Sequence, residues 1–426
     1  MGLTQQVPGH HKGLAMDGVH FPKFLQAVFR PFRERLSKPQ FSHLCWFLFA
    51  LTMSFRKAKL SHIARVAPRG GHRTSCGSFL CADWDAPSLL QDQALRVLRS
   101  MKPQPQEVIY VLIDDTRIEK RGRKMEGASK IYDHKTLRFV RGHIVVTAAL
   151  MFRGVVLPWK IDLWIPKDQA AANYRKINQI AADMIRSFQP PKGLKVRVLF
   201  DAFYLAPNVV RACESQGFTW FSVASKNRKL TRRHCQSRKI KEFAPGVLKH
   251  NSRRVRLRRA RCWRWLKIAC VDGALNRLGQ VRMVLSKRPG DPWKKTLAVA
   301  TNECKLPARE IMAIYEKRWK IEVLFKELRN SLGLCDYQVL RRHAIERHLH
   351  LSCMAHLMLT HHGLKAEGAQ AKQKDKEVSL PPMSQRLENL RASIRHDQTT
   401  ALLKRITNRQ AKATLKTFLQ EFQIAA

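Results

Sequence analysis

The sequence predicts an α/β protein: a mixed β-sheet that carries a β-rich insertion and is flanked by helical segments at both ends. Three observations carry this prediction. Apolar runs rich in β-branched residues occupy the middle of the chain, segments with helical periodicity separate them, and one long, strongly basic stretch interrupts the series. The chain has 426 residues, enough for two to four domains with at least one sizeable core.

The N-terminal quarter of the chain predicts helices. Residues 1–20 are rich in Gly and His and are expected to be disordered, whereas residues 21–105 contain several short helical patterns separated by turns. The apolar run at 41–55 includes His43 and is shorter than the roughly 18–20 residues that a membrane span needs. We therefore expect a buried helix there. The sequence shows no signal-peptide pattern, which predicts a cytoplasmic protein.

A regular series of strands and helices begins at residue 108. It comprises a strand at 108–113, a hairpin of strands at 142–152 and 154–164, a helix at 168–188, a strand at 196–200, a helix at 204–215, a strand at 219–225 and a helix at 307–330. This is the element order of the ribonuclease-H-like fold. The predicted core covers 106–228 and 305–362, the insertion covers 229–304, and a polar linker at 365–382 precedes a helical C-terminal segment at 383–426.

The charge of the chain predicts a polyanionic partner. Lys and Arg number 79 against 32 Asp and Glu, a formal net charge of +47. Such a surplus opposes compaction unless a polyanion neutralises it, and nucleic acid does so with release of counterions. A DNA-binding role is accordingly expected for the helical domain at 21–105. Ten cysteines without a CxxC pair indicate reduced thiols rather than a disulfide scaffold or a zinc site.

Two aspartates are expected to meet at one edge of the sheet. Asp114 and Asp201 each follow a predicted strand, and these two strands lie side by side and parallel in the predicted order. Two such carboxylates repel each other unless a divalent cation lies between them, and Mg²⁺ favours a few protein oxygens completed by water and phosphate. Two ions of this kind can serve phosphodiester cleavage. The alternative is that the strand-end aspartates only cap turns.

The helix at 307–330 has a polar stripe beside an apolar one. At 100° per residue the polar stripe falls within an arc of about 60° and consists of Tyr315, Arg318, Glu322 and Arg329. The apolar stripe, which would dock the helix on the sheet, consists of Ile314, Ile321, Phe325 and Leu328. Glu316 and Glu327 are expected to be solvated. The alternative is a surface helix with i,i+4 pairs such as Arg318 with Glu322.

These segments resemble a known family. YEKRWKIEVLFKELR resembles the Tyr-x2-Arg-x3-Glu-x6-Lys signature of the DDE transposases, in the group with a β-strand insertion (the insertion-sequence-four type). LIDDT and VLFDAFY resemble the two aspartate motifs of that family, so the similarity spans roughly 108–330 in order. Arg329 stands where the family usually has Lys, which keeps the charge but changes the geometry.

The resemblance implies roles for individual residues. It implies Asp114, Asp201 and Glu322 as catalytic metal ligands for Mg²⁺ or Mn²⁺, with two ions. Asp115 is the alternative to Asp114, because adjacent side chains of a strand point to opposite faces, and only the resemblance favours Asp114. Contacts to DNA phosphates are implied for Tyr315, Arg318, Arg329, Lys226 and Arg228. A homodimer on double-stranded DNA is implied by the family alone.

A basic insertion separates the second aspartate from the glutamate. Between Asp201 and Glu322 lies far more chain than one helix and one strand need, and residues 226–267 contain 17 Lys and Arg but a single acid, Glu242. Arg253, Arg254, Arg258 and Arg259 are expected to contact DNA. Trp263 and Trp265 are candidates for stacking on an extruded base, although alternating tryptophans on a strand can also be packing residues.

The sequence thus predicts a DNA transposase. Metal-dependent cleavage at transposon ends would free a 3′-hydroxyl, which would then attack target DNA in strand transfer. The alternatives are a ribonuclease-H-fold nuclease that cuts without joining, and an inactive transposase-derived protein that only binds DNA. We expect the protein to act in the bacterial cytoplasm, associated with the nucleoid.

Overall fold

The computed structural model describes most of the chain. The described residues are 15–16, 19–20, 23–53, 59–66, 73–133, 137–233, 235–259, 262–366, 368 and 377–406. Most of the segment expected to be disordered, 1–20, and the last residues of the predicted C-terminal helical segment, 407–426, therefore lie outside the described residues. Within the former, two short strands, β1 (Ala15–Met16) and β2 (Val19–His20), pair with each other.

Helices make up the described part of residues 23–100. They are α1 (Lys23–Phe29), η1 (Arg30–Arg35), α2 (Lys38–Met53), α3 (Leu60–Val66), α4 (Arg73–Cys81) and α5 (Ala86–Ser100). The apolar run forms α2 and is buried along most of its length, as expected. Asp85 caps α5 by accepting a hydrogen bond from the Ser88 amide at 3.0 Å.

No helix among the described residues is long and apolar enough to cross a membrane.

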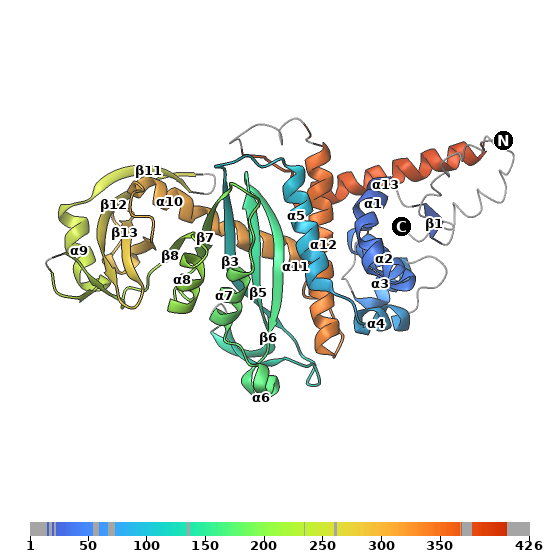
Figure 1. Cartoon of the computed structure of the whole chain (residues 1–426), viewed down its shortest axis with the longest axis horizontal. Coiled ribbons are helices and arrows are strands. Elements are labelled where there is room, and N and C mark those ends of the chain that lie inside the picture. The colour runs from blue at the N-terminus through green and yellow to red at the C-terminus, as the bar shows by residue number, and fades with distance from the viewer. Residues whose placement is uncertain are drawn as a thin grey trace, which may run out of the picture.

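The centre of the molecule is a mixed sheet (Figure 1). Its core strands are β3 (Val108–Glu119), β4 (Ser129–Asp133), β5 (Arg138–Phe152), β6 (Val155–Trp164), β7 (Lys195–Phe200) and β8 (Thr219–Val223). The order is β8-β7-β3-β5, with β4 and β6 both paired to β5. Strands β3, β7 and β8 are mutually parallel, and β5 is antiparallel to β3.

Strand β3 is longer than the sequence predicted. It was expected to end before Asp114, but its pairing with β5 continues to Glu119, whereas its pairing with β7 ends at Leu112. Asp114 and Asp115 therefore still pair with β5 on one side of β3, but they lie beyond the end of the β3–β7 ladder on the other side. Strand β4, which lacks a long apolar run, was not predicted.

Helices cover both faces of the sheet. On one face lie α7 (Ile177–Arg186) and α8 (Pro207–Glu214), and on the other lie α5, α11 (Lys320–Ser331) and α12 (Arg342–Ala366) (Figure 1). The helix expected at 168–188 is broken into α6 (Lys167–Ala170), a turn η2 (Ala171–Asn173) and α7. The helix expected at 307–330 is α10 (Ala308–Glu316), the 3-10 turn η4 (Lys317–Trp319) and α11.

The inserted segment extends the central sheet instead of forming a separate one. It contains β9 (Lys229–Thr231), β10 (Arg238–Lys239), α9 (Ile240–His250), β11 (Arg253–Arg259), β12 (Cys262–Leu275), β13 (Gly279–Lys287), η3 (Trp293–Lys295) and β14 (Leu297–Thr301). Strand β14 pairs with β8 of the core, so one ladder runs from the insertion to β3. The sequence did not predict α9, whose sixth residue is Pro245.

The last described helix leaves the body of the molecule. Helix α13 (Met383–Ile406) begins against α12 and α11 and then projects outward (Figure 1). Its first half buries Met383, Leu387, Leu390 and Ile394.

Candidate active site

The register of two parallel strands brings Asp114 and Asp201 to the same level. The last pairs of the β3–β7 ladder include Leu112 with Leu199. Two residues further along each strand direction stand Asp114 and Asp201. Because side chains alternate between faces with a period of two, both carboxylates fall on the face to which Leu112 and Leu199 point. The expected meeting of two carboxylates at this edge follows from the pairing itself.

The contacts of Asp114 and Asp115 differ. Asp114 Oδ2 accepts a hydrogen bond from Arg318 of η4 at 2.9 Å, whereas Asp115 Oδ1 accepts one from the Tyr204 hydroxyl at 3.1 Å. Tyr204 is fully buried. Asp114 therefore faces the helix that carries Glu322, and Asp115 is turned to the opposite side of the strand. Sequence reasoning left this choice to the resemblance and did not identify Tyr204, although that residue ends the VLFDAFY segment.

Arg318 connects the strand to the helix. Its guanidinium donates to Asp114 and, at 2.6 Å, to Glu322 Oε1 of α11. The Arg318 side chain is only 16 % exposed. The i,i+4 pair of Arg318 and Glu322, offered above as the alternative to a site, is thus present within the site.

Burial and like charges act on the carboxylates. The pKa of Asp114 is raised to about 7: burial is the largest cause, Arg318 opposes it, and the like charges of Asp201 and Asp115 add to the increase. Burial also raises the pKa of Tyr315 to about 12; this residue contacts Arg318 and lies near Asp201 and Asp114. The site thus concentrates negative charge where little water can screen it.

Asp201 is held by its own turn. Its Oδ1 accepts hydrogen bonds from the amides of Phe203 and Tyr204 at 2.9 and 3.3 Å. The hydroxyl of Ser222 on β8 donates to the Asp201 carbonyl at 2.9 Å. These bonds fix the Asp201 carboxylate and the backbone that carries it.

The donor set fits a hard divalent cation. Three carboxylates supply the oxygen ligands that Mg²⁺ prefers, and a cation would offset their repulsion. Within the described part of the chain, however, no three metal-ligating side chains lie close enough together to hold an ion. Arg318, placed between Asp114 and Glu322, supplies positive charge instead.

A comparison with protein families gives a match over the core of the chain. The family model for the transposase DDE domain matches residues 109–358, more than half of the chain. The chain belongs to the DDE transposases. A relative described as "Probable transposase for insertion sequence element IS701" from Microchaete diplosiphon is 23% identical over 294 residues, which cover 67% of this chain and 73% of the relative. The protein is therefore a DNA transposase, an enzyme whose family depends on metal.

Arg329 of the transposase joins α11 to β3. One terminal nitrogen donates to the Thr116 hydroxyl and, at 3.1 Å, to the Arg117 carbonyl. The Nε atom is buried without a hydrogen-bond partner. The residue expected to contact phosphate is thus engaged by the strand that carries Asp114.

Two further basic residues of the transposase are engaged by backbone. Lys226 donates to the Lys294 carbonyl and Arg228 to the Leu205 carbonyl. Arg228 therefore braces the turn that follows Asp201, and Lys226 ties the end of the core to the insertion.

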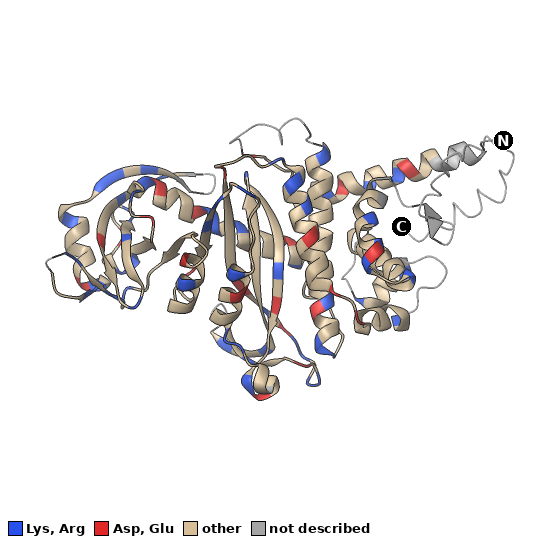
Figure 2. Cartoon of the chain, in the orientation of Figure 1, with Lys and Arg blue, Asp and Glu red and all other residues tan. Residues whose placement is uncertain are grey.

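The insertion of the transposase presents tryptophans on its surface. Trp263 and Trp265 are 53 % and 56 % exposed, so they are not packing residues. The ladder places Trp265 opposite Arg256, whose guanidinium lies 5.4 Å from the Trp263 ring centroid. Lys and Arg follow the outer curve of β11 (Figure 2). Arg253 and Arg254 are exposed, and the side chains of Arg258 and Arg259 lie outside the described ones.

Glu327 of the transposase is not solvated, contrary to expectation. Its carboxylate accepts hydrogen bonds from Arg386 of α13 at 3.0 Å to both oxygens and contacts His356 of α12 at 2.9 Å. Glu327 lies on the side of α11 away from Glu322. From the helical wheel it was clear only that Glu327 lies outside the polar stripe. A basic partner more than fifty positions away gave no signal in the sequence.

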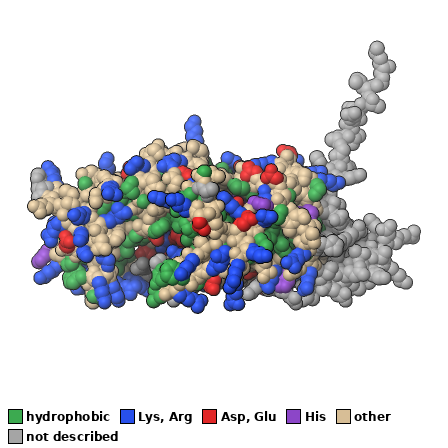
Figure 3. Space-filling view, turned by 90° about the horizontal axis from the view of Figure 1, so that it is seen from below, with side chains coloured by type: hydrophobic (Ala, Val, Ile, Leu, Met, Phe, Trp, Pro, Cys, Tyr) green, Lys and Arg blue, Asp and Glu red, His purple; other side chains and the backbone are tan. Residues whose placement is uncertain are grey.

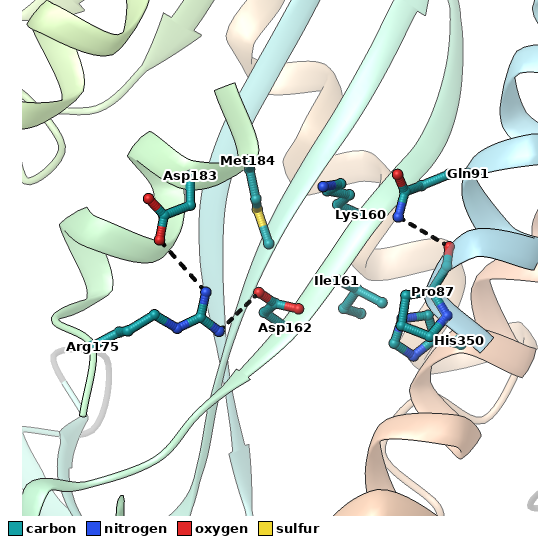
Figure 4. Close-up of a pocket in the computed structure, with 9 residues that line it drawn as sticks. All are labelled: Pro87, Gln91, Lys160, Ile161, Asp162, Arg175, Asp183, Met184 and His350. Carbon is teal, nitrogen blue, oxygen red and sulfur yellow. Dashed lines mark hydrogen bonds and ion pairs between the residues drawn. The ribbon is translucent and has the colours of Figure 1, made fainter. Parts of the chain in front are cut away.

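One cavity of the transposase lies away from the carboxylates (Figure 4). It has a volume of about 110 Å³ and lies at β6, between α5, α7 and α12. Arg175 lies 3.4 Å from Asp162 and 3.6 Å from Asp183, and the Lys160 ammonium donates a hydrogen bond to the Ser187 hydroxyl at 2.6 Å. Arg175 and its two acids are therefore paired with each other, and Lys160 is held by a neutral hydroxyl.

Proposed function

We propose that Asp114, Asp201 and Glu322 carry the chemistry of this transposase: metal-dependent cleavage at transposon ends and strand transfer to target DNA. The observation that carries the proposal is that one guanidinium, that of Arg318, contacts both Asp114 and Glu322. Asp201 lies level with Asp114, because each follows a member of the Leu112–Leu199 pair by two residues. We propose a ribonuclease-H-like core and the insertion-sequence-four type, which the YEKRWKIEVLFKELR segment supports.

The three carboxylates would hold the metal. A pair of Mg²⁺ or Mn²⁺ ions, when bound, supplies activation of the attacking oxygen and stabilisation of the leaving oxygen. Asp201 contributes a carboxylate that is already oriented by the amides of Phe203 and Tyr204. Asp114 contributes one that is costly to ionise alone, because burial raises its pKa to about 7, so that a nearby cation stabilises its charged form.

The polar stripe would position DNA. Arg318 is within reach of both carboxylates and is the residue whose guanidinium would move to a backbone phosphate when DNA and metal are bound. Tyr315, beside it, would contact the same region of backbone. Arg329 would hold α11 on β3 and so position the other residues of the polar stripe. It would also make the phosphate contact that the family implies.

The basic surface would hold the rest of the DNA. We propose that Trp263 and Trp265 stack on an extruded base, while the arginines of β11, which are Arg253, Arg254, Arg258 and Arg259, contact phosphates. Lys226 and Arg228 would line the path from the core to the insertion. The helical domain at 21–105 would bind DNA ends, with 229–304 as insertion and 383–426 as C-terminal segment. We further propose a homodimer on DNA, in the bacterial cytoplasm and associated with the nucleoid.

Two alanine variants test the assignment of the carboxylates. Asp201→Ala and Glu322→Ala should abolish Mg²⁺-dependent cleavage of the DNA ends that flank the gene, while affinity for those ends stays within about threefold of the wild type, because the carboxylates hold metal rather than DNA. Gel analysis of cleaved and strand-transfer products measures the first, and fluorescence anisotropy the second. Wild-type cleavage rates in both variants would refute the assignment.

A further inference from the structure

A second exposed surface of aromatic and basic side chains lies on the β4–β5 hairpin. Tyr132 and Phe139 stand opposite each other, and their ring centroids lie 5.2 Å apart at 65°. The neighbouring pair is Lys130 with Arg141, and the Lys130 ammonium lies 4.7 Å from the Phe139 ring centroid. Phe139 is 60 % exposed and Tyr132 37 %. We name these four residues the hairpin face.

The hairpin face shares a side of the sheet with the carboxylates. Asp114 pairs with Thr147 on β5, and side chains on a strand alternate with a period of two. Phe139 is eight residues before Thr147, so both project from the same side of the ladder. At about 3.4 Å per residue, Phe139 lies about 27 Å from the level of Asp114, beyond the end toward which β3 runs. Figure 3 shows the molecule from below the view of Figure 1, and blue Lys and Arg side chains are spread over that face.

Edge protection explains only part of this composition. Strand β4 ends the sheet at this side, and a lysine on an edge strand discourages pairing with other chains. Two exposed aromatic rings have the opposite effect. A contact with a second copy is disfavoured as well: a two-fold interface would oppose the same basic residues.

We infer that the hairpin face is a second DNA contact of this transposase and takes a strand whose bases are unpaired. The rings of Tyr132 and Phe139 offer a stacking surface that tolerates any base, and Lys130 meets a neighbouring phosphate. Arg141, whose guanidinium donates to the Gly122 and Arg123 carbonyls at 3.4 and 2.9 Å, adds positive charge beside the rings. The inference rests on the proposed function, since it takes DNA to reach the carboxylates on this side of the sheet. It adds a surface that lies apart from the insertion and outside the polar stripe.

Binding of the full-length protein to a 20-nucleotide single strand, and to the blunt duplex of the same sequence, tests the inference. Measurements in EDTA exclude cleavage, so the result does not depend on the carboxylates. Phe139→Ser should weaken single-strand binding by about 5- to 100-fold and duplex binding much less, whereas Phe139→Tyr, which keeps a ring, should bind like the wild type. Lys130→Gln should lower the slope of the log–log salt plot by about 0.7.

Lys192→Gln is the matched charge control, because Lys192 is exposed and lies three residues before β7, near the end of the sheet where β3 and β7 begin, whereas the hairpin face lies beyond the other end. It should leave the salt slope unchanged. Wild-type single-strand affinity in Phe139→Ser, or equal slopes for Lys130→Gln and Lys192→Gln, would overturn the inference. If light scattering showed that Phe139→Ser changes the protein from dimer to monomer while DNA binding stays intact, the inference would also be overturned, and the hairpin face would be assigned to contact with a second copy. Loss of cleavage in Asp201→Ala bears on the proposed function alone.

Discussion

Arg318 donates a hydrogen bond to Asp114 at 2.9 Å across 204 positions of sequence. The same guanidinium reaches Glu322, so two of the three proposed metal ligands already share a positive partner. A cation and Arg318 therefore compete for the same carboxylates. DNA relieves that competition if a phosphate draws the guanidinium away.

We predict that Arg318→Gln binds Mn²⁺ more tightly than the wild type in the absence of DNA, by about tenfold, because no guanidinium competes for Asp114 and Glu322. Isothermal titration calorimetry measures the affinity directly and needs no catalysis. Lys320→Gln is the control. Lys320 is exposed and lies two residues after Arg318, so this change removes a charge without removing a contact to a carboxylate. Equal Mn²⁺ affinity in wild type and Arg318→Gln would contradict this competition.

Asp114→Asn should abolish cleavage, whereas Asp115→Asn should retain measurable activity. Asp114→Asn removes a carboxylate that faces α11. Asp115→Asn keeps a side-chain oxygen that can still accept the hydrogen bond donated by the Tyr204 hydroxyl, which is 3.1 Å long in the wild type. Single-turnover cleavage at saturating Mg²⁺ distinguishes them. Tyr204→Phe, which removes only the hydroxyl, is the companion to Asp115→Asn and should behave similarly. A reversed order would make Asp115 the ligand.

Arg329→Ala should slow cleavage strongly, and Arg329→Lys should keep most activity. Both contacts are made by one terminal nitrogen of Arg329, and a lysine ammonium, with its three N–H donors, can replace that nitrogen while keeping the charge. The measurement is the cleavage rate together with the melting temperature. If Lys were as inactive as Ala in a stably folded protein, the planar guanidinium itself would be required, and charge alone would not account for Arg329.

In the insertion, the ladder separates the arginines by face. Arg254 and Arg256 are two apart and share a face with Trp265, while Arg253 belongs to the other. Changing Arg254 and Arg256 together to Gln should lower the duplex salt slope by about 1.8. Lys192→Gln/Lys195→Gln removes two exposed charges elsewhere and should not. The broader change of Arg253, Arg254, Arg258 and Arg259 should lower the slope by about two to four. Unchanged slopes would exclude this face as a DNA contact.

Arg386→Met should destabilise the protein by about 2–3 kcal/mol, at or below the range for a fully buried pair, because it leaves the partly buried Glu327 carboxylate without its bidentate partner and with only the His356 contact. The double variant Glu327→Leu/Arg386→Met should recover most of the loss. Urea unfolding measures both. The matched surface control is Arg395→Met, on the exposed side of α13. A cost below about 1 kcal/mol for Arg386→Met would show that the pair is effectively solvated.

Local patterns predicted most elements of the core but not how they join. Hydrophobic runs identify β5, β6, β7 and β8, because each of these strands buries apolar side chains and therefore appears in the sequence as a run of apolar residues. The end of β3 was misplaced because a polar strand can continue for as long as its neighbour β5 offers backbone partners. The break at η4 also went unseen, since a single 3-10 turn hardly changes the helical period.

The same division holds for the site. Spacing alone aligned Arg318 with Glu322, since the turn η4 runs directly into α11 and keeps the two residues one turn apart. That Asp114 rather than Asp115 faces them depends on which side of the sheet the helix packs, a tertiary fact. Glu327 shows the limit most clearly: its partner Arg386 follows a linker whose path no local pattern specifies.

The pairing of β14 with β8 has a consequence for the modularity of this enzyme. Inserted segments are usually regarded as removable, because their ends lie close together on a finished scaffold. Here the excision of 229–304 would also remove β14 and uncover the length of β8 that now pairs with it. A bare interior strand of apolar composition is a template for intermolecular association. The truncated enzyme should therefore be prone to aggregate, and this insertion could be shortened at its far end but not deleted.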